Sequence, residues 1–372
     1  MEITHHANSF IEIAESNTNL LCDPWISTAN HGAWHVVPDI PEAVAIQIVA
    51  RATHIYISHL HSDHLCTKLL KKCDLRNKIF IISKFPTPTL KQEIEALSPL
   101  SILQFEPWVK QQIGDFDVAV IPQVASSTSP TETSINYDLD TSLLVYSKRD
   151  KMVFFNKVDN PLPLASITQV MDFSLKTFGR KPDIATFNVG AASEYPQCFL
   201  GIDRDFERNR IIEQSLIFFE KEIAIIAPKF AFPAGGLYSL AGGRTVLNKW
   251  LAIPEATVVI NRAKTASPAT TTVDLMGAGS IKTQLTEPFI TATEGSWKFP
   301  EFNILRASIF DYETTESTKD EKCSYEENVA LALDTYQRMS TQFVPNLDWS
   351  IKINLYHNFA ITESGEISNS KI

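Results

Sequence analysis

Four residues that could bind metal ions lie within a six-residue stretch of this chain. The segment 58–65 reads Ser-His-Leu-His-Ser-Asp-His-Leu and contains three of the nine histidines, with a carboxylate among them. His59 and His61 follow a predicted strand two residues apart, so both imidazoles could bind one ion, whereas Asp63 and His64 begin the next turn and could face a second. Three histidines would be a poor choice for a core without a metal, because they are liable to become charged. The spacing therefore predicts a dinuclear metal site.

Such a site has a characteristic chemistry. Two adjacent ions hold the attacking and the leaving oxygen of a substrate and lower the pKa of a water molecule between them. The first function that we infer is therefore hydrolysis of an ester, thioester, amide or phosphoester by a metal-bound hydroxide. A small-molecule substrate is expected, because the chain has no cluster of Lys and Arg for binding a nucleic acid.

The elements around this segment must bring the metal-binding side chains to one edge of a sheet. Residues 54–58 form an apolar run, typical of a buried strand, that ends at the first histidine. The other predicted strands are 9–13, 19–22, 78–83, 116–121, 141–146, 152–156 and 223–227, and the predicted helices are 65–72, 89–97, 211–219 and 325–339. Residues 263–320 are rich in small and hydroxyl side chains and are expected to form loops and edge strands. Strands that alternate with helices in this way indicate an α/β layered sandwich.

The composition indicates a folded, soluble protein. Hydrophobic residues make up 44% of the 372 residues, which is enough for a sizeable core, and the formal net charge of −10 argues against binding to nucleic acid or to a membrane surface. No apolar run approaches the roughly 18 residues of a membrane-spanning helix. The five cysteines form no disulfide framework and the start of the chain does not resemble a signal peptide, so we expect a cytoplasmic protein with reduced thiols.

The segment 59–64 resembles the HxHxDH signature of the metallo-β-lactamase superfamily. The similarity extends to residues 6–11 and 21–25, which resemble the opening hairpin of that fold. Asp159 follows a predicted strand at the place where the superfamily has its metal-bridging aspartate. The resemblance implies a four-layer αββα sandwich over residues 1–310.

The same resemblance implies catalytic roles for Asp63 and Asp159. Asp159 would bridge the two ions and orient the nucleophile, although an aspartate two residues before Pro161 could instead serve only in a turn. Residues 311–372 are expected to form a C-terminal helical extension packed on the catalytic domain.

Four segments look like the metallo-β-lactamase-like part of CMP-N-acetylneuraminate hydroxylase, namely 57–65, 139–141, 190–196 and 231–236. That family also has a Rieske iron–sulfur domain, whose paired Cys and His ligands are not found in this chain. The resemblance implies an alternative function, a non-haem diiron or mononuclear iron oxygenase that would receive electrons from a separate protein. Hydrolysis ranks first because it is the more common activity of the superfamily.

The ligand set departs from that of a typical hydrolase of this superfamily. Such enzymes use further histidines, but no histidine lies between His64 and His357. Glu132 and Asp140 are the preferred replacements, because both precede a strand expected beside that of Asp159; each could equally be an ordinary loop residue. The other possibilities are Asp138, His6 and His357. Carboxylate in place of imidazole favours iron or manganese over zinc for the two divalent ions, or leaves one position empty.

Four residues are candidates for substrate contacts: His6, Trp25, Ser193 and Tyr195. Trp25 lies where the fold often has a substrate flap, and it could instead close the core. Ser193 and Tyr195 belong to the segment 190–196, which could cover the pocket or form a simple turn.

Overall fold

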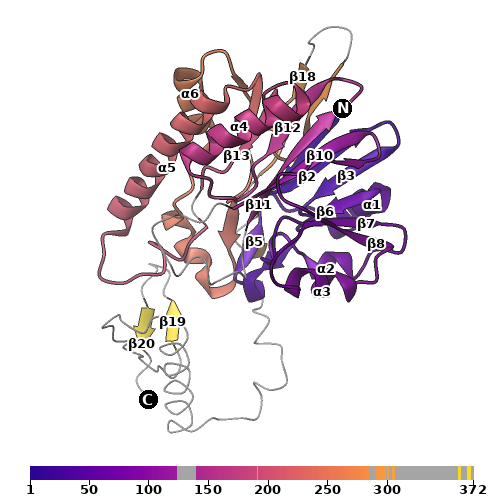
Figure 1. The fold of residues 1–372 in the computed structure, drawn as a ribbon. Coiled ribbons are helices and arrows are strands. Elements are labelled where there is room, and N and C mark those ends of the chain that lie inside the picture. The colour runs from indigo at the N-terminus through magenta and orange to yellow at the C-terminus, as the bar shows by residue number, and fades with distance from the viewer. Residues whose placement is uncertain are drawn as a thin grey trace, which may run out of the picture.

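Two β-sheets packed face to face form the centre of the protein (Figure 1). The computed structural model describes residues 1–123, 140–190, 192–284, 290–298, 300, 304–305, 359–361 and 367–369. The first sheet has eight strands in the order β18 (Ile290–Thr293), β17 (Gly279–Thr283), β1 (Glu2–Ala7), β2 (Phe10–Glu15), β3 (Thr18–Cys22), β6 (His54–Tyr56), β7 (Ile79–Ser83) and β8 (Ser101–Phe105). The second has seven, in the order β16 (Thr271–Thr272), β14 (Phe230–Pro233), β13 (Ile184–Phe187), β12 (Met152–Asn156), β11 (Thr141–Ser147), β10 (Phe116–Pro122) and β9 (Gln111–Ile113).

Two smaller sheets complete the strands that the structure describes. One contains β15 (Tyr238–Leu240), β5 (Trp34–Val36) and β4 (Thr28–Ala29), and the other pairs β19 (Phe359–Ile361) with β20 (Ile367–Asn369). Short 3₁₀ segments are η1 (Asn30–Gly32) and η2 (Gly242–Trp250).

Helices cover the outer face of each large sheet (Figure 1). α1 (Glu42–Arg51), α2 (Thr67–Leu70) and α3 (Thr89–Glu95) pack on the first sheet, and α4 (Leu164–Phe178), α5 (Arg204–Ile226) and α6 (Ala256–Ala266) pack on the second. The predicted four-layer αββα sandwich is therefore confirmed.

The alternation of side chains along the strands produces three hydrophobic layers. In β12, Phe154 points into the core between the sheets, whereas its neighbours Val153 and Phe155 point toward the helices of the second sheet. Ile11 and Tyr56 reach the same central core from the first sheet. The continuous apolar runs seen in the sequence are thus strands that are buried on both faces.

The helix ends follow local capping rules. Asp203 begins α5 by accepting a hydrogen bond from the Phe206 amide, 3.0 Å away, and α4 ends at Gly179, whose φ of 75° is left-handed. The prediction of a strand at 223–227 is wrong, because residues 223–226 are the last turn of α5 and Ala227 is its C-cap. Ile223 and Ile226 lie on the same buried helical face as Phe219, so helical periodicity outweighs the strand preference of isoleucine.

Most other predicted elements agree with the structure within a few residues. The strand predicted at 152–156 coincides with β12, whereas 263–266, expected in a loop, belong to α6. The predicted helix 325–339 lies outside the described residues, so the helical extension 311–372 stays a prediction. The four cysteines that the structure describes, Cys22, Cys66, Cys73 and Cys198, are free thiols. Within the described ranges, no helix has both the length and the apolar character needed to cross a bilayer.

A buried carboxylate ties the first three strands to α1. Glu12 on β2 accepts hydrogen bonds from Arg51 Nε (2.6 Å), from Asn19 Nδ2 on β3 (2.6 Å) and from His6 Nε2 on β1 (3.0 Å). Burial alone would raise the pKa of Glu12, but these bonds outweigh burial and lower the pKa to about 2.

Replacing Glu12 should therefore cost stability in a pH-dependent way. Since the pKa falls from 4.5 in the unfolded chain to about 2 in the folded protein, the carboxylate stabilises the fold above pH 4.5, and this contribution is lost as the pH falls toward 2. Thermal unfolding of Glu12→Gln should begin several degrees lower than that of the wild type at pH 7, with the difference shrinking below pH 4.5. Glu2→Gln, which removes an exposed ion pair with Lys282, serves as the control and should change little. Equal melting temperatures of Glu12→Gln and the wild type at pH 7 would contradict this assignment.

Candidate metal centre

The metal-binding segment begins where β6 ends. β6 lies between β3 and β7 and is parallel to both, and the next residues carry the side chains of His59 to His64 to the carboxyl edge of the first sheet. A turn follows, in which the amides of His64 and Leu65 both donate to the carbonyl of His61, at 2.9 and 2.8 Å. The turn points His59, His61, Asp63 and His64 toward the second sheet.

The second sheet supplies two aspartates at the same edge. Asp140 directly precedes β11 and Asp159 follows the end of β12, and these strands are antiparallel, with Leu143 opposite Asn156. The start of one strand therefore meets the end of the other. The two sheets are joined here by Thr141, whose hydroxyl donates to the Ser58 carbonyl (2.7 Å) and accepts a bond from the Tyr56 hydroxyl (2.6 Å).

Three of these side chains form a first group, called here the His59 triad: His59, His61 and Asp140. One ligand atom from each lies within 4.8 Å of the others. His59 Nε2 is 2.8 Å from His61 Nδ1 and 3.3 Å from Asp140 Oδ1. Burial, together with the neighbouring imidazoles of His64 and His61, holds the pKa of His59 well below its usual value. A neutral imidazole has the free lone pair that a metal ligand needs.

The second group, called the His64 triad, contains Asp63, His64 and Asp159. His64 Nε2 is 3.1 Å from Asp159 Oδ2 and 3.5 Å from Asp63 Oδ2. The ring centroids of His64 and His59 are 4.0 Å apart, so the two triads are adjacent. Burial opposes a charge on His64, but the surrounding carboxylates outweigh burial and raise its pKa well above the usual value.

A buried aspartate orients the His64 ring through a hydrogen bond to its Nδ1 atom. Asp23 is fully buried, and its carboxylate accepts bonds from the Ser58 amide (2.8 Å), the Ser58 hydroxyl (2.7 Å) and His64 Nδ1 (3.0 Å). Because Nδ1 donates to Asp23, Nε2 of His64 is the atom directed toward Asp63 and Asp159.

Asp159 is positioned by neighbours on both sides. Asn188 donates to its Oδ1 at 2.9 Å, which leaves Oδ2 directed toward His64. On the other side a Cβ atom at Gly235 would lie 2.5 Å from Oδ1, and Gly235 has a φ of 85°. The preceding Val158 has a left-handed φ of 55°, which is unfavourable for a β-branched residue and marks a strained loop at the site.

The structure brings five of the predicted metal ligands together: His59, His61, Asp63, His64 and Asp159. It also places Asp140, one of the two preferred replacements for a missing histidine, beside the His59 triad's imidazoles. The other replacement, Glu132, lies outside the described residues, as do Asp138 and His357.

The candidate substrate-binding residues are not grouped in this way. His6 is buried and bonded to Glu12, and Trp25 is fully buried in the core beneath α1 and α2, the alternative role considered for it. Ser193 is exposed and its hydroxyl accepts a bond from the Tyr195 amide at 3.1 Å, as in a local turn. None of these four belongs to either triad.

Two residues of the site escaped the sequence analysis. Asp23 stands between a cysteine and a proline at the end of a predicted strand, a pattern that gave no sign of its contact with His64. Asn188 lies 29 residues after Asp159, and only the parallel pairing of β12 with β13 brings it near. A polar residue at the end of a buried strand is the one signal that could have indicated both.

Substituting Gly235 should disturb Asp159. In Gly235→Ala the new methyl group would meet the Asp159 carboxylate, whereas Gly201→Ala, at a similar φ of 74°, would find nothing within 4 Å. Both variants should lose a similar amount of stability to backbone strain, of about 1 kcal/mol. Only Gly235→Ala should also lower the metal content of purified protein, measured by elemental analysis. Equal metal content in the two variants would show that the turn at Gly235 does not position Asp159.

Comparison with known proteins gives partial matches. No protein-family model matches the chain. A putative Rieske 2Fe-2S iron–sulfur protein of Mycolicibacterium smegmatis is 26% identical over 168 residues, covering 44% of this chain and 31% of that protein. The cytidine monophosphate-N-acetylneuraminic acid hydroxylase of Asterias rubens is 32% identical over 116 residues, covering 30% of this chain and 18% of that enzyme. The matches thus span less than a third of the length of these relatives.

A solved structure matches over most of the chain. The isothiocyanate hydrolase from Delia radicum gut bacteria aligns with a TM-score of 0.50 and 10% identity, covering 76% of this chain and all of that one. This similarity, the αββα layers and the HxHxDH segment at the end of β6 show that the chain has the metallo-β-lactamase fold.

Proposed function

We propose that this protein is an enzyme with two adjacent metal ions, one bound by the His59 triad and one by the His64 triad. The observation that carries the proposal is that six potential ligands from both sheets converge in two adjacent groups at one edge. In many enzymes two adjacent metal ions act together on the reacting atoms of the substrate.

The charges of the site fit divalent cations. The carboxylates of Asp23, Asp63 and Asp159 all face the single ring of His64, which can carry only one positive charge. Buried carboxylates in excess of their partners are costly, and a divalent cation between Asp63 and Asp159 would balance them. In the His59 triad the imidazoles of His59 and His61 direct nitrogen atoms at one another, as two ligands of one ion do.

The ligand types favour iron. Each triad contains carboxylate oxygen, and in the His59 triad this oxygen comes from Asp140, a candidate replacement for a missing histidine. Oxygen ligands suit harder ions such as iron or manganese better than zinc. Bound iron would supply the redox chemistry for activating O₂, whereas bound zinc would supply an activated water molecule.

We therefore place hydroxylation of a small molecule by a diiron enzyme ahead of hydrolysis, reversing the order inferred from sequence. The partial relatives support this order, because one is named a hydroxylase and another an iron–sulfur protein. A hydroxylase needs two electrons for each turnover in addition to O₂, so the proposal includes an electron-donor protein or domain. In this scheme Asp23 fixes the ring of His64, and Asn188 fixes Asp159 so that its Oδ2, beside His64 Nε2, would be available to hold an ion.

Hydrolysis is the second candidate. Two metal positions side by side suit the binding of both the attacking and the leaving oxygen of a hydrolysed substrate. The identity of the bound metal distinguishes the hydroxylase function from the hydrolase function.

The metal content of aerobically purified protein tests the order of these functions. Protein from a culture supplemented with iron and zinc should contain about two irons per chain and show a visible charge-transfer band that bleaches on reduction. His59→Ala should lose most of the metal, whereas His54→Ala, on β6 but outside both triads, should retain it. Zinc without a visible band would favour hydrolysis and lead to an ester and thioester screen. Absence of metal would contradict both functions.

The role of Asp140 can be tested by changing its ligand atom. Asp140→His replaces oxygen by nitrogen beside His59 and His61, and the ratio of iron to zinc bound should fall several-fold as a result. The control is Asp172→His, on the exposed face of α4, which should leave the ratio unchanged. An unchanged ratio in Asp140→His would remove Asp140 from the ligand set.

A further inference from the structure

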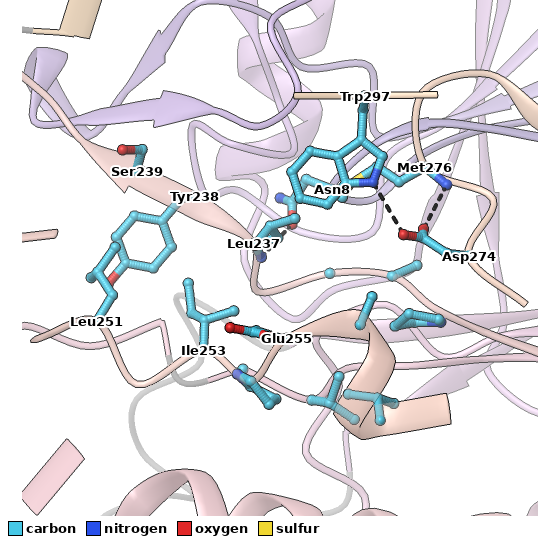
Figure 2. Close-up of a pocket in the computed structure, with 18 of the residues that line it drawn as sticks. Asn8, Leu237, Tyr238, Ser239, Leu251, Ile253, Glu255, Asp274, Met276 and Trp297 are labelled. Atoms are coloured by element: carbon cyan, nitrogen blue, oxygen red, sulfur yellow. Dashed lines mark hydrogen bonds between the residues drawn. The ribbon is translucent and has the colours of Figure 1, made fainter. Parts of the chain in front are cut away.

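A cavity of about 620 Å³ lies beside the metal centre (Figure 2). It is bounded by the turn between β14 and β15, by η2, by the start of α6 and by the segment 274–276, with Trp297 at its edge. Its volume falls in the range of sites for small organic ligands. No step of the proposed function uses it.

The cavity and the metal centre share one wall. Gly235 lines the cavity, and the same residue contacts Asp159, since a Cβ there would lie 2.5 Å from Oδ1. Asn8, another lining residue, accepts the Gly235 amide through its carbonyl at 3.1 Å and the Leu237 amide through its side chain at 3.1 Å. The turn that carries Gly235 is thus held rigidly between the two sites.

Much of the lining is apolar. Figure 2 shows Trp297, Leu237 and Ile253 arranged around the space, with Tyr238 and Met276 farther along its wall. An aromatic or alicyclic ring would bury its surface against these side chains.

Several hydrogen-bond donors of the lining already donate to protein acceptors. Trp297 Nε1 donates to Asp274 Oδ2 at 3.1 Å, as Figure 2 shows. Three other donors are paired in the same way: the Tyr238 hydroxyl with the Ser193 carbonyl (3.1 Å), the Thr245 hydroxyl with the Gly242 carbonyl (2.7 Å) and Arg208 Nε with the Leu251 carbonyl (3.0 Å).

Acceptor groups of the lining remain for a ligand, and negative charge exceeds positive charge among them. Asp274 and Glu255 bring two carboxylates to the cavity, against the single guanidinium of Arg208. His5, which is 1% exposed, donates from Nε2 to the Asn8 carbonyl at 2.7 Å, so its Nδ1 carries a lone pair. This Nδ1 has no hydrogen-bond partner among the residues that the structure describes. The cavity therefore favours a ligand that donates hydrogen bonds and carries positive charge.

We propose that this cavity is a binding site for a small molecule that combines an apolar ring with a protonated amine. The ring packs against Trp297, Leu237 and Ile253, and the ammonium group lies near Asp274 and Glu255, where the Trp297 ring adds a cation–π contact. The site goes beyond the proposed function and needs no metal ion.

Calorimetric titration of the protein as purified with 2-naphthylmethylamine tests this site. Saturable binding of one molecule per chain is expected, and 2-naphthoate, of the same shape but opposite charge, should bind at least about tenfold more weakly. Asp274→Asn should weaken binding of the amine several-fold. The amine should bind equally well to His59→Ala, because the site is separate from the metal ligands.

Two substitutions to tryptophan test whether the ligand binds in this cavity. Ile253→Trp fills the cavity and should abolish binding, whereas Val258→Trp, at a side chain of α6 that is exposed and outside the lining, should not. Binding that Ile253→Trp leaves intact would overturn the proposal, as would equal affinity for amine and naphthoate or loss of binding in His59→Ala. If circular dichroism shows that Ile253→Trp does not fold, the proposal is tested by the relative affinities of the amine and the naphthoate and by the affinity of Asp274→Asn for the amine.

Discussion

The carboxylate of Asp23 is the contact through which the fold and the candidate metal centre depend on each other. Its backbone amide donates to the Tyr56 carbonyl at 3.0 Å and so extends the pairing of β3 with β6. Its side chain, fully buried, accepts hydrogen bonds from the amide and the hydroxyl of Ser58 and from the ring of His64. A buried carboxylate must have such partners, so the same charge that orients His64 also fixes the loop that carries the other ligands.

The second requirement is that two sheets meet at one edge. Candidate metal ligands on the loop after β6 face Asp140 and Asp159 only because β11 and β12 are antiparallel, so that the start of β11 and the end of β12 both lie at the edge where Thr141 bonds Ser58. The hydroxyls of Tyr56 and Thr141 bridge this junction in the middle of the hydrophobic core. In such surroundings hydrogen bonds are strong and an unpaired group is costly, so the relative position of the sheets is tightly specified there.

Some of the chain around Asp159 is held in unfavourable geometry. Val158 adopts a left-handed conformation, and the turn at Gly235 approaches the carboxylate too closely for any side chain. Strain of this kind persists where the surrounding structure imposes it, and it concentrates at functional sites. The Gly235 turn also forms part of the wall of the neighbouring cavity.

The sequence by itself determined the main candidate ligands and the class of fold. His59, His61, Asp63 and His64 are close in the chain, so their convergence requires only one strand end and one turn, both of which are local properties. The spacing of apolar residues, with periods of 2 and 3.6 residues, likewise indicated strands and helices. It gave the wrong element at 223–227, because a short isoleucine-rich segment fits a strand or a helix equally well and only its packing in the folded protein shows which one forms.

Only the tertiary structure decided which distant side chains complete the site. Asp140 could not be separated from other loop carboxylates until the pairing of β11 with β12 placed it 3.3 Å from His59. The roles of Asp23 and Asn188 were missed, because contacts between residues tens of positions apart depend on strand order and register. For the same reason the sequence did not show that the side chains of His6 and Trp25 are buried away from the two triads. Strand order and register are set by burial of the two sheet faces against each other, a property of the whole chain that no short segment carries.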